Sequence, residues 1–205
     1  MSLVEQLKPA ALSEIVGHAQ AVEQLEKLCS RPGWTGDNFA FTGPTGIGKT
    51  SLATALCRRF ADPFEILELD GDACTLDAVQ NLACHWHYSP MLGDWKAVIV
   101  NEAHAMTDKA VQAWLTALER RPPKRIVCFT TTENEAWGKY TAPMLGRCKV
   151  FRLVASPGAR SAFADRLVAL AESSGKKLDR FIAEAWITKH TGSFRAALQE
   201  LDLWL

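Results

Sequence analysis

The residues Gly43-Pro44-Thr45-Gly46-Ile47-Gly48-Lys49-Thr50 match the pattern Gly-x-x-x-x-Gly-Lys-Ser/Thr at every fixed position. Glycines let backbone N–H groups curl around a phosphate, and the N-terminus of a following helix favours negative charge. Lys49 can reach the β- and γ-phosphates of a nucleotide, and the Thr50 hydroxyl can ligate Mg²⁺. The alternative is a glycine turn that carries a chance Lys-Thr pair. The segment predicts an ATP and Mg²⁺ site formed by Gly43, Pro44, Thr45, Gly46, Ile47, Gly48, Lys49, Thr50 and Ser51.

A second polar pair, Asn101-Glu102, follows the apolar run Ala97–Val100. At the metal end of such a site an acid is expected where Asn101 stands. An amide oxygen can still accept a hydrogen bond from a metal-bound water, but it lacks the negative charge. We therefore expect Asn101 to be a weak, water-mediated metal ligand. Glu102 can orient the attacking water, unless it is only a solvated loop carboxylate. The prediction is an ATPase with weakened Mg²⁺ binding and slow hydrolysis.

Apolar strand-like runs alternate with amphipathic helical patterns along the first 155 residues. Strands are predicted at 38–42, 64–69, 96–100, 125–130 and 149–153, and helices at 49–60, 76–86 and 108–120. Such alternation predicts an α/β fold with a parallel sheet flanked by helices. From residue 156 onward only helical patterns occur, with stop signals at Gly175 and Gly192. The sequence thus predicts an α/β domain at 1–155 and a small three-helix domain at 156–205.

Composition favours a globular protein of the cytoplasm. The chain has 205 residues and a formal net charge of zero, so a strongly basic nucleic-acid binder is not indicated. No signal peptide or membrane-length apolar run is visible, which predicts no membrane association. Several of the six cysteines lie in apolar segments, as reduced core cysteines do. Zinc binding by Cys74, Cys84, His85 and His87 is the weaker alternative, because their spacing matches no common zinc pattern.

The order of these motifs resembles an AAA+ ATPase of the clamp-loader type over nearly the whole chain. ALSEIVGHAQAVEQL is similar to the family's N-terminal segment, which implies that Val16 and Gly17 border the adenine. NEAH stands at the place of the family's DEAH-like motif, and DKAVQAWLTALERRPP resembles the helix that follows it. The resemblance implies a P-loop module followed by a helical lid.

The resemblance also assigns roles to three later residues. FTTTEN resembles the end of the sensor 1 strand, which implies Thr132 as the γ-phosphate sensor, although three consecutive threonines leave the register open. Gly146-Arg147-Cys148 resembles a Ser-Arg-Cys motif, whose arginine acts in trans on a neighbour's ATP. Gly192-Ser193-Phe194-Arg195 resembles sensor 2, which places Arg195 at the phosphates. The alternative for both arginines is a surface ion pair.

The family implies a function and a set of partners. The leading hypothesis is an ATP-hydrolysing subunit of a ring of AAA+ subunits that loads a sliding clamp onto primer-template DNA. One alternative is a nucleotide-binding structural subunit that donates Arg147 and hydrolyses little itself. Another is the motor of a Holliday-junction branch-migration complex. Clamp-loader subunits continue into a helical collar beyond the point matching Leu205, so we expect either a fragment or partners held differently, and weak self-association.

The segment Arg120–Arg125 is locally basic. We expect a solvated helix end, because cations favour helix C-termini. A contact with DNA phosphates is the alternative.

Overall fold

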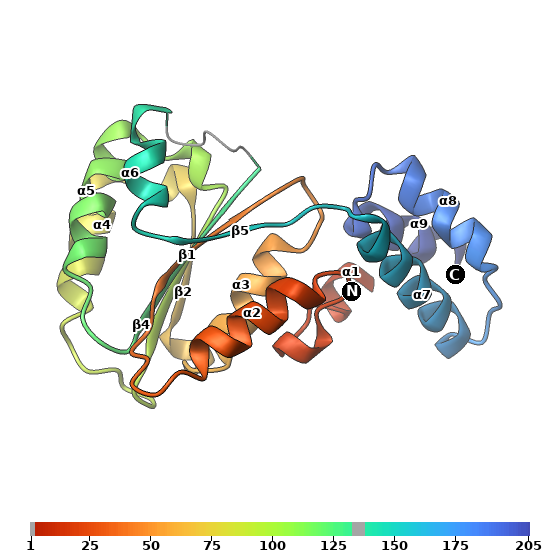
Figure 1. Ribbon diagram of the computed structural model, residues 1–205, viewed down its shortest axis with the longest axis horizontal. Helices are drawn as coiled ribbons and strands as arrows, with labels where there is room; N and C mark the ends of the chain where they lie inside the picture. The colour runs from red at the N-terminus through yellow and green to blue at the C-terminus, as the bar shows by residue number, and fades with distance from the viewer. Residues whose placement is uncertain (1–2, 133–137) are drawn as a thin grey trace.

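The computed structural model describes residues 3–132 and 138–205. A parallel sheet forms its centre (Figure 1). Its strand order is β2-β3-β4-β1-β5. The strands are β1 (Asn38–Thr42), β2 (Ile66–Asp70), β3 (Lys96–Asn101), β4 (Arg125–Thr131) and β5 (Lys149–Arg152). Every residue of β1 and β4 is buried, as expected for central strands covered on both faces. The predicted α/β fold with a parallel sheet is confirmed.

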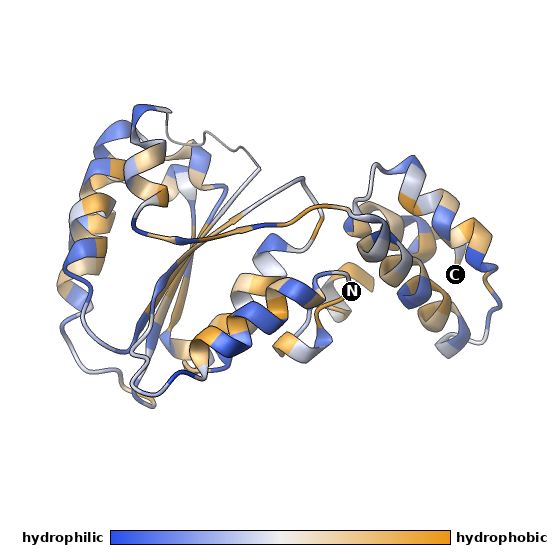
Figure 2. Ribbon diagram, in the orientation of Figure 1, coloured by the Kyte–Doolittle hydropathy of each residue, from blue (hydrophilic) through white to orange (hydrophobic). Residues whose placement is uncertain are grey.

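Helices cover both faces of this sheet (Figure 1). On one face lie α2 (Ala19–Cys29) and α3 (Lys49–Arg58), and on the other lie α4 (Leu76–His85), α5 (Asp108–Glu119) and the short α6 (Thr141–Leu145). These helices carry hydrophobic and hydrophilic residues side by side (Figure 2). Their apolar sides form two separate cores, one on each face of the sheet. Thr75 and Thr107 cap α4 and α5 by accepting hydrogen bonds from Ala78 and Ala110 amides.

The chain leaves the sheet after β5 and continues as α7 (Pro157–Ser173), α8 (Arg180–Lys189) and α9 (Phe194–Trp204). We call these three helices the lid. Ser156, Asp179 and Ser193 cap them. The lid core is continuous with the core under α2 and α3. The short α1 (Leu3–Gln6) packs on α9, so the N-terminal end of the chain lies beside the lid (Figure 1).

Short 3-10 turns complete the fold. They are η1 (Leu12–Glu14), η2 (Pro63–Glu65), η3 (Gly71–Ala73), η4 (Ala103–Ala105) and η5 (Gly138–Tyr140). Two of them, η3 and η4, follow the adjacent strands β2 and β3 and contact each other. They therefore lie at the end of the sheet where the phosphate loop also begins.

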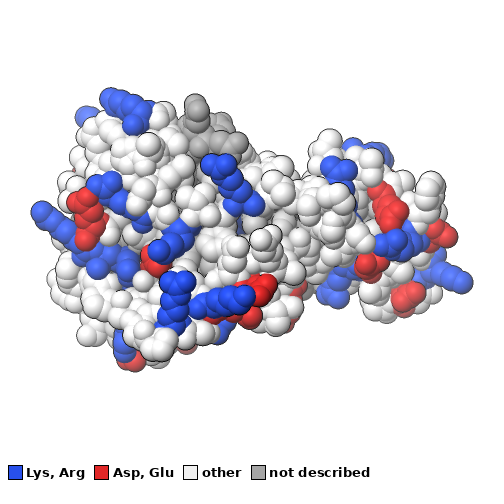
Figure 3. All heavy atoms as spheres, viewed as in Figure 1, with Lys and Arg blue, Asp and Glu red and all other residues white. Residues whose placement is uncertain are grey.

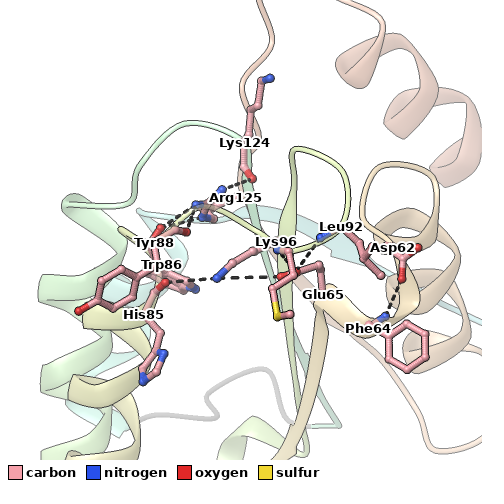
Figure 4. Close-up of polar contacts among 11 residues, drawn as sticks. Asp62, Phe64, Glu65, His85, Trp86, Tyr88, Leu92, Lys96, Lys124 and Arg125 are labelled. Carbon is pink, nitrogen blue, oxygen red and sulfur yellow. Dashed lines mark hydrogen bonds and ion pairs between the residues drawn. The ribbon is translucent and has the colours of Figure 1, made fainter.

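The basic segment at Arg120–Arg125 is less solvated than its charge predicts. Arg125 is buried and donates hydrogen bonds to the carbonyl oxygens of Trp86, at 2.9 and 2.7 Å, and Tyr88, at 3.0 Å (Figure 4). Lys124 pairs with Asp94 at 2.8 Å. Arg121 donates to the Gly36 carbonyl oxygen at 3.0 Å. The expectation of a solvated helix end was wrong for Arg121 and Arg125. Both side chains donate hydrogen bonds to loop carbonyl oxygens near the start of β4.

Candidate nucleotide-binding site

The predicted phosphate loop lies between β1 and α3. Its glycines have the positive φ angles that other residues avoid, +75° at Gly46 and +106° at Gly48. Lys49 is buried within the loop, and its ammonium group donates to the carbonyl oxygens of Gly43, at 2.8 Å, and Pro44, at 2.9 Å. Burial lowers the pKa of Lys49, an effect that Glu102 opposes and Arg195 reinforces. The positive charge is thus held inside the loop by two of its carbonyl oxygens.

Three oxygen-bearing side chains meet at the start of α3. Asn101 Oδ1 accepts hydrogen bonds from the hydroxyl groups of Thr50, at 3.0 Å, and Thr130, at 3.2 Å. Small, hard oxygen donors of this kind suit Mg²⁺. The Thr50 and Asn101 side chains therefore fit the predicted metal position, with the Asn101 oxygen facing the loop. Each of these three residues comes from a different element: α3, β3 and β4.

Glu102 occupies a strained backbone position directly after β3. Its φ and ψ angles of 46° and 47° are left-handed, which is uncommon for a residue with a side chain. Gly71 packs so closely on the Glu102 carbonyl oxygen that a Cβ there would clash. The Glu102 carboxylate is half exposed and lies 3.5 Å from His104 Nδ1. Because strain of this kind persists only where surrounding contacts enforce it, the turn fixes a carboxylate near the buried Lys49.

A cavity of about 250 Å³ lies between the phosphate loop, the N-terminal segment and the lid. Its lining includes Val16, His18, Ile47, Phe194 and Arg195. Val16 lines this cavity, and its contact with an adenine stays a prediction. Gly17 does not line this cavity. It packs against the Phe163 ring instead, so closely that a Cβ would clash.

The lid contacts the phosphate loop directly. The Arg195 amide donates to the Gly46 carbonyl oxygen at 3.2 Å, and a Cβ at Gly46 would clash with Ser193 Oγ. The structure thus places Arg195 beside the loop, and its predicted contact with the phosphates stays a prediction.

His18 also joins the lid to the loop. Sequence reasoning assigns no role to this residue, although it directly follows Val16 and Gly17. Its Nε2 hydrogen-bonds to the Ile47 carbonyl oxygen at 2.8 Å. Its ring meets Phe163 edge-on at 5.9 Å, and Phe163 stacks on Phe194 at 4.7 Å. The buried imidazole therefore connects the phosphate loop to α7 and α9.

Arg147 lies far from this loop. Its carbonyl oxygen accepts a hydrogen bond from Asn38, the first residue of β1, whereas the loop follows the last residue of that strand. The strand spans roughly 13 Å at about 3.3 Å per residue. The Arg147 guanidinium pairs with Glu119 and donates to the Pro143 carbonyl oxygen at 3.0 Å. The structure therefore does not bring Arg147 together with the other predicted residues of its own chain.

The structure shows which of the three consecutive threonines contact other residues of the site, which the sequence alone does not determine. Thr130 contacts Asn101, and Thr131 lies 3.3 Å from His104 Nδ1. Thr132, the predicted sensor, follows the last residue of β4 and is half buried. Sequence reasoning missed the Thr130 contact, because strand alternation puts Thr130 and Thr132 on the same face and does not say which one reaches Asn101. Glu133 and Asn134, the last two residues of FTTTEN, lie outside the described residues.

The described residues give no support to the alternative of a zinc site. Among residues 3–132 and 138–205, no group of three or more His, Cys, Asp and Glu side chains could hold a metal ion. Cys74 is buried while Cys84 is exposed. None of the helices in the same ranges is long and apolar enough to cross a membrane.

Solved structures define the class of fold. The chain is similar to the Thermotoga maritima RuvB Holliday junction branch migration motor, with a TM-score of 0.76 and 16% identity, over 95% of this chain and 64% of that one. A DNA polymerase III gamma subunit-related protein from the same organism gives a TM-score of 0.56 and 20% identity, over 74% and 51% of the two chains. The protein therefore has the AAA+ fold, in which the P-loop module is followed by a helical lid.

Sequence comparisons narrow this class. Residues 61–156 match the family described as DNA polymerase III, delta subunit. The replication factor C small subunits of Archaeoglobus fulgidus and Thermofilum pendens are 28% and 30% identical to this chain, each over 97% of it. The chain spans 62% and 61% of those two relatives. It is an AAA+ protein of the clamp-loader type.

Proposed function

We propose that this protein binds ATP with Mg²⁺ between the phosphate loop and the lid and hydrolyses it slowly as one subunit of a clamp-loader-like assembly. The observation that carries the proposal is the convergence of Lys49, Thr50 and Asn101 on the phosphate loop. The same loop borders the cavity that Arg195 lines from the lid. These side chains supply the cation, the metal ligands and the lid contact that phosphoryl transfer requires. The adenine would lie in the cavity lined by Val16, and the phosphates would lie on the loop.

Phosphoryl transfer depends mainly on positioning and on stabilising charge at the γ-phosphate. Thr50 and Asn101 would hold Mg²⁺, whose positive charge would neutralise part of this charge when it is bound. Glu102 would orient the attacking water, with the left-handed turn setting its direction. Lys49 would exchange its loop carbonyl partners for phosphate oxygens. Arg195 would reach the phosphates from the lid.

The hydrolytic site is proposed to be completed by a neighbour. Arg147 lies at the opposite end of β1 from the loop of its own chain, which is the placement expected of an arginine that acts in trans. To do so it would leave Glu119 for the γ-phosphate of an adjacent subunit. The partners would be other AAA+ subunits, a sliding clamp and primer-template DNA. DNA contact would be made through the assembly. On the face shown in Figure 3, Lys and Arg side chains are scattered rather than gathered in one band.

Asn101 favours a second candidate function. A site without the usual acid suits a structural subunit that binds nucleotide, orders the ring and donates Arg147 while hydrolysing little. RuvB-like motor function has only the shared fold to support it. The sequence likeness over nearly the whole chain is to replication factor C small subunits.

ATP turnover by the chain assembled with its partner subunits separates the candidates. A partner set whose own sites carry inactivating changes reports hydrolysis at this site alone. We expect slow turnover by the native chain, loss of that turnover in Glu102→Gln, and unchanged nucleotide binding in the variant. Arg147→Ala serves as the matched control, because it leaves this site intact and removes a contact only from the neighbouring one. Equal background rates for the native chain and Glu102→Gln would replace the ATPase with the structural subunit.

A further inference from the structure

Glu68 contacts Asn101, the amide that stands where an acid is expected at the metal position. It lies on β2, and its Oε1 accepts a hydrogen bond of 2.5 Å from Asn101 Nδ2. The neighbouring strands explain the contact, since Asp70 is in register with Asn101 and Glu68 lies two residues earlier. Side chains two residues apart share one face of a sheet, so Glu68 points toward the same face as Asn101.

The chemistry of this pair determines which atom Asn101 presents to the loop. An ionised carboxylate only accepts hydrogen bonds, so the amide nitrogen must face Glu68. The amide oxygen then faces Thr50 and Thr130, which both donate to it. A reversed amide would point its N–H groups at the metal position and its oxygen at the Glu68 carboxylate. Aspartate has no such ambiguity, because both of its oxygens can accept.

We propose that Glu68 is the positioning residue that makes Asn101 usable as a metal-site ligand. It holds the Asn101 amide in the orientation that points the oxygen toward Thr50. Its carboxylate, on the opposite side of the amide, also supplies part of the negative charge that Asn101 lacks. This inference rests on the proposed nucleotide and Mg²⁺ binding. Groups that orient a metal ligand in this way change metal affinity by about 10- to 100-fold when removed.

The Mg²⁺ dependence of ADP binding measures this role without any hydrolysis. A fluorescent ADP analogue is titrated into the full chain at a series of Mg²⁺ concentrations, and the Mg²⁺ concentration giving half of the maximal affinity gain is recorded. We expect Glu68→Ala to raise that concentration about tenfold. Glu68→Gln should raise it less, because its amide oxygen can still accept from Asn101 while its charge is gone. Binding without Mg²⁺ should be unchanged in both variants, because Glu68 lies on the surface behind Asn101.

A second background separates orientation from charge. With Asn101→Asp there is no amide to orient, so Glu68→Ala and Glu68→Gln should have equal effects on Mg²⁺ affinity. With Asn101→Ala there is no ligand to orient, so the effect of Glu68→Ala should shrink to that of its charge. Such non-additivity is expected only for residues that act through each other. Asp72→Asn is the matched control, since it removes an exposed carboxylate just beyond β2 that has no hydrogen bond to Asn101.

The outcomes distinguish this inference from the proposed function. If the native chain does not bind ADP at all, the proposed function fails. If ADP binds and responds to Mg²⁺, but Glu68→Ala behaves like Asp72→Asn, only the role of Glu68 is overturned. Equal effects of Glu68→Ala in the Asn101 and Asn101→Ala backgrounds would also overturn it. ADP binding that ignores Mg²⁺ in the native chain would overturn it as well, because no metal affinity would then depend on Asn101.

Discussion

At the scale of single residues, His18 links the phosphate loop to the lid. It is buried, hydrogen-bonds to the Ile47 carbonyl oxygen and packs on Phe163. Burial lowers the pKa of His18 below its ordinary value of 6.5, although the Ile47 hydrogen bond partly offsets this. The unfolded chain therefore binds a proton more readily than the folded one. This contribution to stability is complete above pH 6.5 and is lost as the pH falls toward the lower pKa of the folded state.

We accordingly predict that acid weakens the native protein more than a variant without this imidazole. The free energy of unfolding is measured by urea denaturation between about pH 7.5 and pH 5.5, the range in which histidine titrates. The difference between the native protein and His18→Gln should shrink as the pH falls. His87→Gln is the control, because His87 lies beside Pro123 and Lys124 and does not line the cavity between the loop and the lid. A difference that stays constant or grows would show that His18 is not buried in its neutral form.

The role of a residue could be predicted where it belongs to a short contiguous motif. It could not be predicted where the contact depends on how the strands pair. Lys49 and Thr50 belong to a contiguous motif, so the sequence places them without any knowledge of the sheet. Thr130 lies within β4 and Thr132 directly follows it, and consecutive threonines give no sequence signal for which one reaches Asn101. The contact between Glu68 and Asn101 depends on the pairing of β2 with β3, which joins residues 33 positions apart.

At the scale of elements, α9 meets the phosphate loop at Gly46. This glycine has a φ of +75°, and a Cβ there would clash with Ser193 Oγ, the cap of α9. We predict that Gly46→Ala loosens α9 from the loop. Hydrogen exchange at the Arg195 amide, which donates to the Gly46 carbonyl oxygen, should become faster.

Gly33→Ala is a matched control for backbone strain. Gly33 has nearly the same φ, +76°, but a Cβ there would meet nothing within 4 Å. If exchange at Arg195 rises equally in both variants, strain alone explains the effect. If it rises in neither, the lid does not depend on contact with the loop.

Helices and strands with a long periodic pattern were predicted to within about two residues at most ends. The short α1 and α6 were not predicted, because four or five residues show too little periodicity and so short a helix depends on packing. In the structure α1 packs on α9. The boundary near residue 155, between the sheet and the lid, stays a prediction. The shared core of α2, α3 and the lid links the parts on either side of it.

At the scale of the whole molecule, one end of the sheet gathers the predicted nucleotide-binding residues and the opposite end of β1 carries Arg147. The lid lines one side of the cavity next to the nucleotide-binding residues, and Glu119 forms an ion pair with Arg147. On the proposed function, a single chain therefore combines a nucleotide site with an arginine that would act on the nucleotide of another chain. This division explains why hydrolysis is expected from the assembly, whereas nucleotide binding is expected from the chain alone.

Binding of ATP by the isolated chain tests the central claim most directly. Isothermal titration with ATP and Mg²⁺ should give one site per chain in the native protein. Lys49→Ala should weaken binding at least tenfold, because it removes the buried cation under the phosphate loop. Lys27→Ala, which removes an exposed lysine on α2, should bind like the native protein. No measurable binding by the native chain, or equal affinity in Lys49→Ala, would contradict the account.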